Sequence, residues 1–96
     1  MKLVYAEPAV ADLVRLRGFI SEKNPSASAR VAHELISRID YLRAFPDMGR
    51  AVAQAPQPQL VRDAVLGKYI VRYTAHAEAV VILRIWHHFE ERESSP

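Results

Sequence analysis

The chain has 96 residues, half of them hydrophobic, with 13 lysines and arginines against 11 acidic residues and a formal net charge of +2. A chain of this length buries about 60–65% of the surface that it exposes when unfolded, so we expect a single small domain over residues 1–96. The absence of cysteine excludes disulfides, thiolate nucleophiles and cysteine metal sites, and the natural expectation is a reducing, cytoplasmic compartment. The apolar run at the start is too short for a signal peptide or a membrane span.

The first third of the chain predicts a strand followed by an amphipathic helix. Residues 2–6 are β-branched and aromatic, and Pro8 fits the first turn of a helix. Apolar side chains then recur every three or four positions over residues 8–23, and the Asn24-Pro25 pair ends the helix, because a residue before proline is pushed out of helical geometry. The predicted apolar stripe consists of Val10, Leu13, Leu16, Phe19 and Ile20, whereas Asp12, Arg15, Glu22 and Lys23 are assigned to solvent.

A second helix is predicted from Pro25 onward for about 20 residues. Its apolar stripe consists of Ala29, Ala32, Leu35 or Ile36, Ile39 and Leu42, and Phe45 is the last residue expected to pack. Pro46 ends the helix, and the segment 43–52 (RAFPDMGRAV) then reverses the chain. We expect a positive φ at Gly49 and hydrogen bonds from Arg50 to the carbonyls of this loop.

The rest of the chain has the composition of strands and turns. Residues 51–59 predict a surface loop or irregular edge strand, and residues 60–66, 68–75 and 79–89 predict three strands joined by tight turns at Gly67 and at residues 76–78. Short turns make such strands an antiparallel meander, and residues 90–96 predict a frayed polar tail. The fold class expected is therefore α+β, with two N-terminal helices packed on a small antiparallel sheet in the order β-α-α-β-β-β.

Strict alternation along the strands predicts which side chains share a face. On the last strand it separates Val81, Leu83, Ile85 and His87 from Val80, Ile82, Arg84, Trp86 and His88. On the strand before, it separates Tyr69, Val71 and Tyr73 from Ile70, Arg72 and Thr74. Because arginine is rarely buried unless it is paired, we expect Arg72 and Arg84 on the face away from the helices. The residues predicted to bind a target are Arg62, Arg72, Arg84, Trp86 and His88.

Four features along the chain resemble one known family when taken in order. They are Asn24-Pro25 with an alanine-rich helix start, the stop FPDMGR (45–50), the strand YIVRY (69–73) and a hydrophobic strand that ends in His87. This order resembles the RelE/ParE superfamily of bacterial toxins from type II toxin-antitoxin systems, over nearly the whole chain. The resemblance implies a helix pair against an antiparallel sheet and a dedicated, ParD-like antitoxin. It also implies one of two activities: inhibition of DNA gyrase, as in ParE-like members, or cleavage of messenger RNA on the ribosome, as in RelE-like members.

The residue chemistry can be weighed separately from the resemblance. Metal-free RNA cleavage needs groups that accept and donate a proton, and cations that stabilise the charge developing on the phosphate. The candidate nuclease set is Arg62, Arg84 and His87, in which the choice of His87 is what the resemblance to the family implies. Alternation instead favours His88 as the histidine beside Arg84. The low net charge and the incomplete set favour a ParE-like, non-hydrolytic toxin; the alternatives are a RelE-like endonuclease and a degenerate, non-toxic module that only binds the antitoxin.

The same residues also have purely structural interpretations. Arg72 and Arg84 could pair with Asp63 or Glu78, which contributes about 0–1 kcal/mol at an exposed site. Trp86 could be a filler of a small core, and His87 a hydrogen-bonded residue at the core edge. The four histidines lack metal-ligand spacing and no glycine-rich phosphate loop is present, so no metal or cofactor is expected.

A partner surface is predicted on the first helix. Val14 and Phe19 flank its main stripe and make the helix apolar over a wide arc, which suits the amphipathic segment of a partner. The residues predicted to bind the antitoxin are Leu13, Val14, Leu16, Phe19 and Ile20. Operator DNA is expected to be reached only through the antitoxin.

Overall fold

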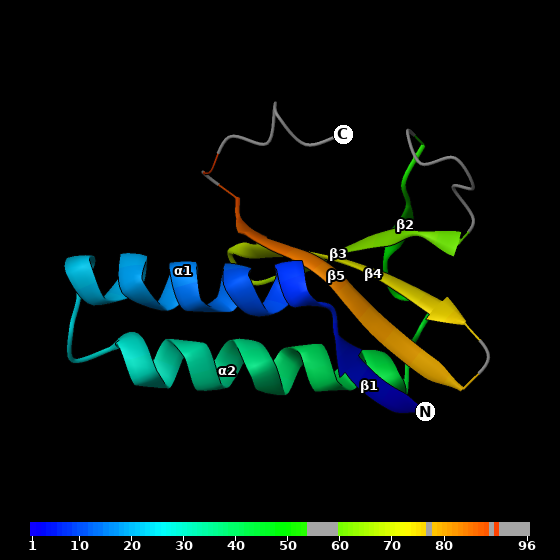
Figure 1. The fold of residues 1–96 in the computed structure, drawn as a ribbon, viewed down its shortest axis with the longest axis horizontal. Coiled ribbons are helices and arrows are strands. Elements are labelled where there is room, and N and C mark those ends of the chain that lie inside the picture. The colour runs from blue at the N-terminus through cyan, green and yellow to red at the C-terminus, as the bar shows by residue number, and fades with distance from the viewer. Residues whose placement is uncertain (54–59, 77, 89, 91–96) are drawn as a thin grey trace.

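The α+β architecture predicted from the sequence is confirmed by the computed structural model, which describes residues 1–53, 60–76, 78–88 and 90. The elements in chain order are β1 (Lys2–Tyr5), α1 (Glu7–Lys23), α2 (Ser28–Asp40), the 3₁₀ turn η1 (Tyr41–Arg43), β2 (Arg50–Ala51), β3 (Arg62–Leu66), β4 (Tyr69–His76) and β5 (Ala79–His87). The two helices lie side by side along one face of the sheet (Figure 1). Except for Glu90, the predicted tail lies outside the described residues, as do residues 54–59 of the predicted loop. No described helix is long and apolar enough to cross a membrane.

The sheet is mixed and not wholly antiparallel. Its strand order is β1-β5-β4-β3-β2, and β3, β4 and β5 form the predicted antiparallel meander. β1 instead pairs parallel with β5, in a register that joins Lys2 to Ala79 and Tyr5 to Ile82. Parallel neighbours need a long crossover, which the helices and the other strands provide here. At the opposite edge, β2 pairs with β3 over only two residues, so the irregular edge strand expected there is short.

A β-bulge in β5 changes which of its side chains face the helices. Arg72 pairs with Arg84, but the next residue, Tyr73, pairs with Ile82, so Leu83 is an extra residue. Val80 and Ile82 are consequently buried on the same side as Ile85. The predicted alternation is therefore wrong for residues 80–83, where the bulge reverses it, and holds after the bulge.

The helices bury somewhat different faces from those predicted. On α1, Ala9 is buried in place of Val10, and Asp12, which was assigned to solvent, is only 4% exposed. α2 begins at Ser28 and not at Pro25, because residues 24–27 form a turn in which the N–H of Ala27 donates to the carbonyl of Asn24. Phe45 is exposed and does not extend the core. The buried cluster includes Leu16, Leu35, Ile39, Leu42, Val71, Tyr73, Val80, Ile82 and Ile85.

The reversal after α2 is held by β4. The buried hydroxyl of Tyr73 accepts a hydrogen bond from the N–H of Gly49 (2.9 Å) and donates one to the carbonyl of Pro46 (2.7 Å). A Cβ on Gly49 would come within 2.8 Å of the carbonyl oxygen of Asp63, so glycine is needed for close approach. The expected positive φ at Gly49 is wrong, since Gly67 is the glycine with that conformation (φ 64°). The arginine that tethers this loop is Arg62, whose Nη1 donates to the carbonyl of Gly49 (2.7 Å).

Candidate functional site

The face of the sheet away from the helices carries a stacked group of arginines and one tryptophan. Arg72 donates two hydrogen bonds to the carboxylate of Asp63, at 2.9 and 3.0 Å. The guanidinium carbons of Arg72 and Arg84 lie 5.0 and 5.5 Å from the centre of the Trp86 ring. Trp86 is only 3% exposed, so it supports the two arginines and has little surface of its own for a target, which agrees with its alternative interpretation as a core filler.

Arg84 also reaches around the edge of β5 to the first helix. β1 pairs with β5 only as far as Ile82, and no other described strand lies beside the next part of this edge. Asp12 of α1 covers it: its Oδ2 accepts the backbone N–H of Ile85 (2.8 Å) and the Nε of Arg84 (2.8 Å). Arg15 completes the edge by donating to the carbonyl of Ile85 (3.1 Å) and to Asp12 (3.1 Å), and it also pairs with Glu90. A buried carboxylate thus satisfies a strand edge and fixes Arg84.

The electrostatics of this network follow from its hydrogen bonds. Burial acts to raise the pKa of Asp12, but the bonds from Arg84, from the N–H of Ile85 and from Arg15 outweigh it and lower the pKa below its ordinary value. The hydrogen bond to Asp12 raises the pKa of Arg84 in return, against a smaller opposing effect of burial. Both groups are therefore charged near neutral pH and neutralise each other.

His87 lies on the helix-covered side of β5. Its ring meets the ring of Tyr69 edge-on at 5.3 Å, lies 6.1 Å from that of Phe19 and stacks on His88 at 5.1 Å. Burial lowers the pKa of His87, and the neighbouring His88 adds to this effect, so the imidazole is neutral at pH 7. His88 is exposed, and its Nδ1 lies 3.2 Å from the carbonyl oxygen of Lys68.

The three residues of the candidate nuclease set are not assembled into one site. Arg84 and His87 project from opposite faces of β5. They are three residues apart on the part of the strand that follows the bulge, where successive side chains alternate between the two faces. Arg62 is on β3, where it holds the carbonyl of Gly49 and lies 3.8 Å from the carboxylate of Asp47. Each arginine of the set therefore has an acceptor within the protein. The functional assignment of these residues stays a prediction.

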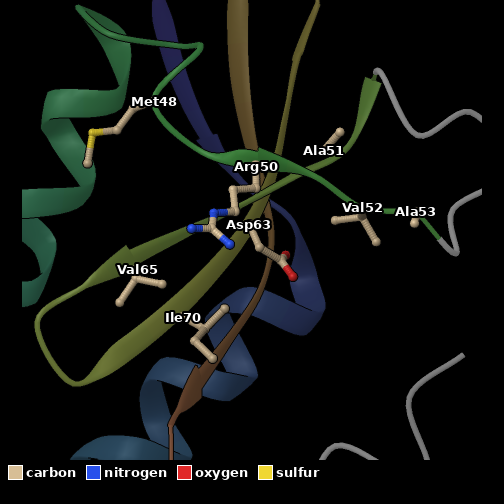
Figure 2. Close-up of a pocket in the computed structure, with 8 residues that line it drawn as sticks. All are labelled: Met48, Arg50, Ala51, Val52, Ala53, Asp63, Val65 and Ile70. Carbon is tan, nitrogen blue, oxygen red and sulfur yellow. The ribbon is translucent and has the colours of Figure 1, made fainter.

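A hollow at the β2 and β3 edge is a feature that sequence reasoning missed. It encloses about 690 Å³ and is lined by Met48, Arg50, Ala51, Val52, Ala53, Asp63, Val65 and Ile70. Arg50 and Asp63 lie at its centre, between Met48 and Val65 on one side and Val52 on the other (Figure 2). Arg50 was expected to tether the loop, but it is exposed and forms no ion pair within the described part of the chain. Exposed Val65 and Met48 beside this charge give the open face a mixed apolar and cationic character.

The surface predicted on α1 for the antitoxin is only partly accessible. Leu16 is 2% exposed and belongs to the core, and Leu13 and Ile20 are half-buried against it. Val14 and Phe19 are 70% and 42% exposed. Because the face of α1 that packs on the core is not available to a partner, the accessible part of this surface is reduced to Val14, Phe19 and the exposed edges of their neighbours. Among the described residues, no three histidines or acidic residues gather in a group that could hold a metal ion.

Comparison with known proteins identifies the family. A family model described as the ParE toxin of the type II toxin-antitoxin system parDE matches residues 3–92. The chain belongs to this toxin family. Its relatives include Toxin RelE3 of Caulobacter vibrioides, 36% identical over 93 residues that cover 96% of this chain and 100% of that toxin. Toxin RelE2 of the same organism is 35% identical over 86 residues, covering 90% of this chain and 93% of that toxin.

A solved structure shows the same fold. The chromosomal ParDE TA system from P. aeruginosa contains a chain that superposes with a TM-score of 0.77 at 21% identity, over 91% of this chain and 95% of that one. The chain is therefore a type II toxin of the RelE/ParE superfamily, and membership of a toxin-antitoxin family implies an antitoxin partner.

Proposed function

We propose that this ParE-family toxin arrests growth by binding DNA gyrase, does not cut RNA, and is neutralised by a ParD-like antitoxin. The observation that carries the proposal is the separation of Arg84 from His87 on opposite faces of β5, with Arg84 held by the carboxylate of Asp12. A nuclease needs its cations and its proton-transfer group around one phosphate. As part of this proposal, the toxin acts in the cytoplasm, where its target is, and it reaches operator DNA only through the antitoxin.

The charges of the open face support protein binding over phosphate chemistry. Arg72 is neutralised by Asp63, and Arg84 by Asp12, so neither adds a free charge to stabilise a phosphate in a transition state. Interfaces between proteins, in contrast, combine arginines with apolar side chains. The open face has this composition, with Arg50 beside exposed Val65 and Met48 in the hollow. We assign gyrase contact to this face.

The toxin is expected to inhibit DNA supercoiling by purified gyrase, and His87→Ala is expected to inhibit it to within about twofold of the wild type. His87 faces the helix layer, so its removal leaves the proposed contact face intact. Supercoiling is measured on relaxed plasmid, with His33→Ala as the control, since His33 is exposed on α2. Retained supercoiling in the presence of folded wild-type toxin would refute the proposal.

A second candidate is a RelE-like, ribosome-dependent mRNA endonuclease, which the names of the curated relatives favour. It requires His87 for proton transfer, so His87→Ala would abolish cleavage and toxicity while the protein stays folded and bound to its antitoxin. Cleavage of mRNA on purified ribosomes by the wild type, lost in this variant, would select this candidate. Soluble overexpression without growth arrest would instead indicate a non-toxic module that only binds the antitoxin.

A further inference from the structure

A groove at the end of the helical layer differs in its lining from the open face. It lies where the C-terminal half of α1, one side of α2 and the turn between β3 and β4 meet, and it has a volume of about 550 Å³. Of the five α1 residues predicted to contact the antitoxin, Phe19 and Ile20 line this groove. The rest of its lining comes from elements that the sequence analysis did not connect with a partner.

The floor of the groove is apolar and aromatic. Ile20 of α1 and Val31 of α2 line the floor from the two helices, and Tyr69 and His87 line it from the sheet. Phe19 remains 42% exposed although its ring lies 6.1 Å from that of His87. Because the imidazole of His87 is neutral at pH 7, this part of the groove carries no charge. A partner that covers the floor would remove apolar surface from water.

The rim of the groove is cationic. Its charged residues are Lys23, Arg30, Glu34, Arg38 and Lys68. Glu34 is the single carboxylate among them, and it lies 3.7 Å from Arg30. In the part of the chain that the structure describes, no carboxylate lies within ion-pair distance of Lys23, Arg38 or Lys68. The guanidinium of Arg38 lies against the β3–β4 turn, so close to Gly67 that a Cβ on this residue would collide with it. Three cations thus line the apolar floor without a neutralising carboxylate among the described residues.

We propose that this groove receives an acidic segment of the antitoxin, with apolar side chains on the floor and carboxylates directed at Lys23, Arg38 and Lys68. The proposal rests on the proposed function in taking the antitoxin as the partner. Charge complementarity favours an acidic segment, and the apolar floor favours the side chains of a peptide. A nucleic acid would need several exposed rings for its bases to stack on, and Phe19 is the one exposed ring in the lining.

The test measures antitoxin affinity for groove variants of the full-length toxin at low and high salt. The double charge reversal Lys23→Glu/Lys68→Glu is expected to raise Kd by about 10-fold at low salt and by less at high salt, because exposed charges are screened. Phe19→Ala is expected to raise Kd by about 10-fold at both salt concentrations, because it removes an apolar contact. All these side chains are on the surface, and unchanged thermal unfolding would show that the variants are folded.

Two variants of α1 outside the groove serve as matched controls. Arg17→Glu reverses an exposed charge and Val10→Ala shortens an exposed apolar side chain, and both are expected to change Kd by less than about twofold. Wild-type affinity in the groove variants, or an equal loss in the controls, would overturn the proposal. A loss of binding to a 20-nucleotide polyuridine RNA, with antitoxin binding intact, would also overturn it.

Gyrase supercoiling measured on the same proteins separates this inference from the proposed function. Groove variants that lose the antitoxin but still inhibit gyrase support both. If antitoxin binding falls as expected while even the wild type leaves gyrase untouched, the groove assignment stands and the gyrase target does not. If gyrase is inhibited while the groove variants bind the antitoxin normally, the groove assignment alone fails.

Discussion

Replacing Asp12 by alanine is expected to lower the free energy of unfolding by about 2–4 kcal/mol. The Asp12 carboxylate is buried and accepts hydrogen bonds from Arg84, from Arg15 and from the backbone N–H of Ile85. Its removal leaves that N–H without an acceptor at a strand edge and takes from Arg84 its carboxylate partner, whereas Arg15 keeps Glu90. Chemical denaturation at pH 7 measures the loss. The matched control is Glu34→Ala, which removes an exposed ion pair and is expected to change stability by less than about 0.5 kcal/mol.

The pH dependence of this stability loss tests whether the negative charge of Asp12 causes it. The folded protein lowers the pKa of Asp12 below the unfolded value of about 3.9. Its contribution to stability is therefore complete above that pH, and it is lost as the pH falls through the folded pKa. The difference between wild type and Asp12→Asn should be largest at neutral pH and should shrink below about pH 4. A difference that does not change with pH, or an alanine variant as stable as Glu34→Ala, would show that the network is not what holds this edge.

Tyr73→Phe is expected to lower the free energy of unfolding by about 2 kcal/mol. The lost hydroxyl is the group that joins the reversal after α2 to the sheet, since it bonds both the N–H of Gly49 and the carbonyl of Pro46. Both backbone groups would lose a partner inside the protein, and the ring would keep its packing. Denaturant titration measures the effect, and hydrogen exchange at Gly49 should rise with it.

Tyr69→Phe provides a control on the same strand and the same face. The hydroxyl of Tyr69 makes no hydrogen bond in the described part of the chain, so its loss is expected to change stability by less than about 0.5 kcal/mol. Equal losses for the two variants would mean that burial of the rings, and not the link to Gly49, stabilises the reversal.

The sequence predicted most of what depends on local patterns. The chain reversal after Pro46, the tight turn at Gly67 and the Arg72–Asp63 pair kept as an alternative all follow from neighbouring residues or neighbouring strands, although α2 already ends at Asp40. The bulge at Leu83 could not be predicted in this way, because no residue type marks it and because it depends on how β5 packs against two neighbours. A single extra residue then reversed the faces of Val80 and Ile82.

The role of Asp12 was hidden for a different reason. A polar residue in an amphipathic helix is normally assigned to solvent, and only the unequal lengths of β1 and β5 reveal that a strand edge beyond Ile82 needs an acceptor. Asp12 and Arg15, three residues apart, provide an acceptor and a donor for that edge. The hydrogen bonds of the candidate nuclease arginines could not be predicted for the same reason. The groups that accept from Arg62 and Arg84 come from segments distant in the sequence.

The claim that this toxin acts by binding, without turnover, is tested most directly by the stoichiometry of its action. Gyrase at a fixed concentration is titrated with toxin, and ribosomes loaded with mRNA are titrated in parallel. The account predicts that supercoiling falls in proportion to the ratio of toxin to gyrase and that the mRNA stays intact. Supercoiling that is unaffected at excess toxin, together with cleavage of many mRNA molecules by each toxin molecule, would contradict it.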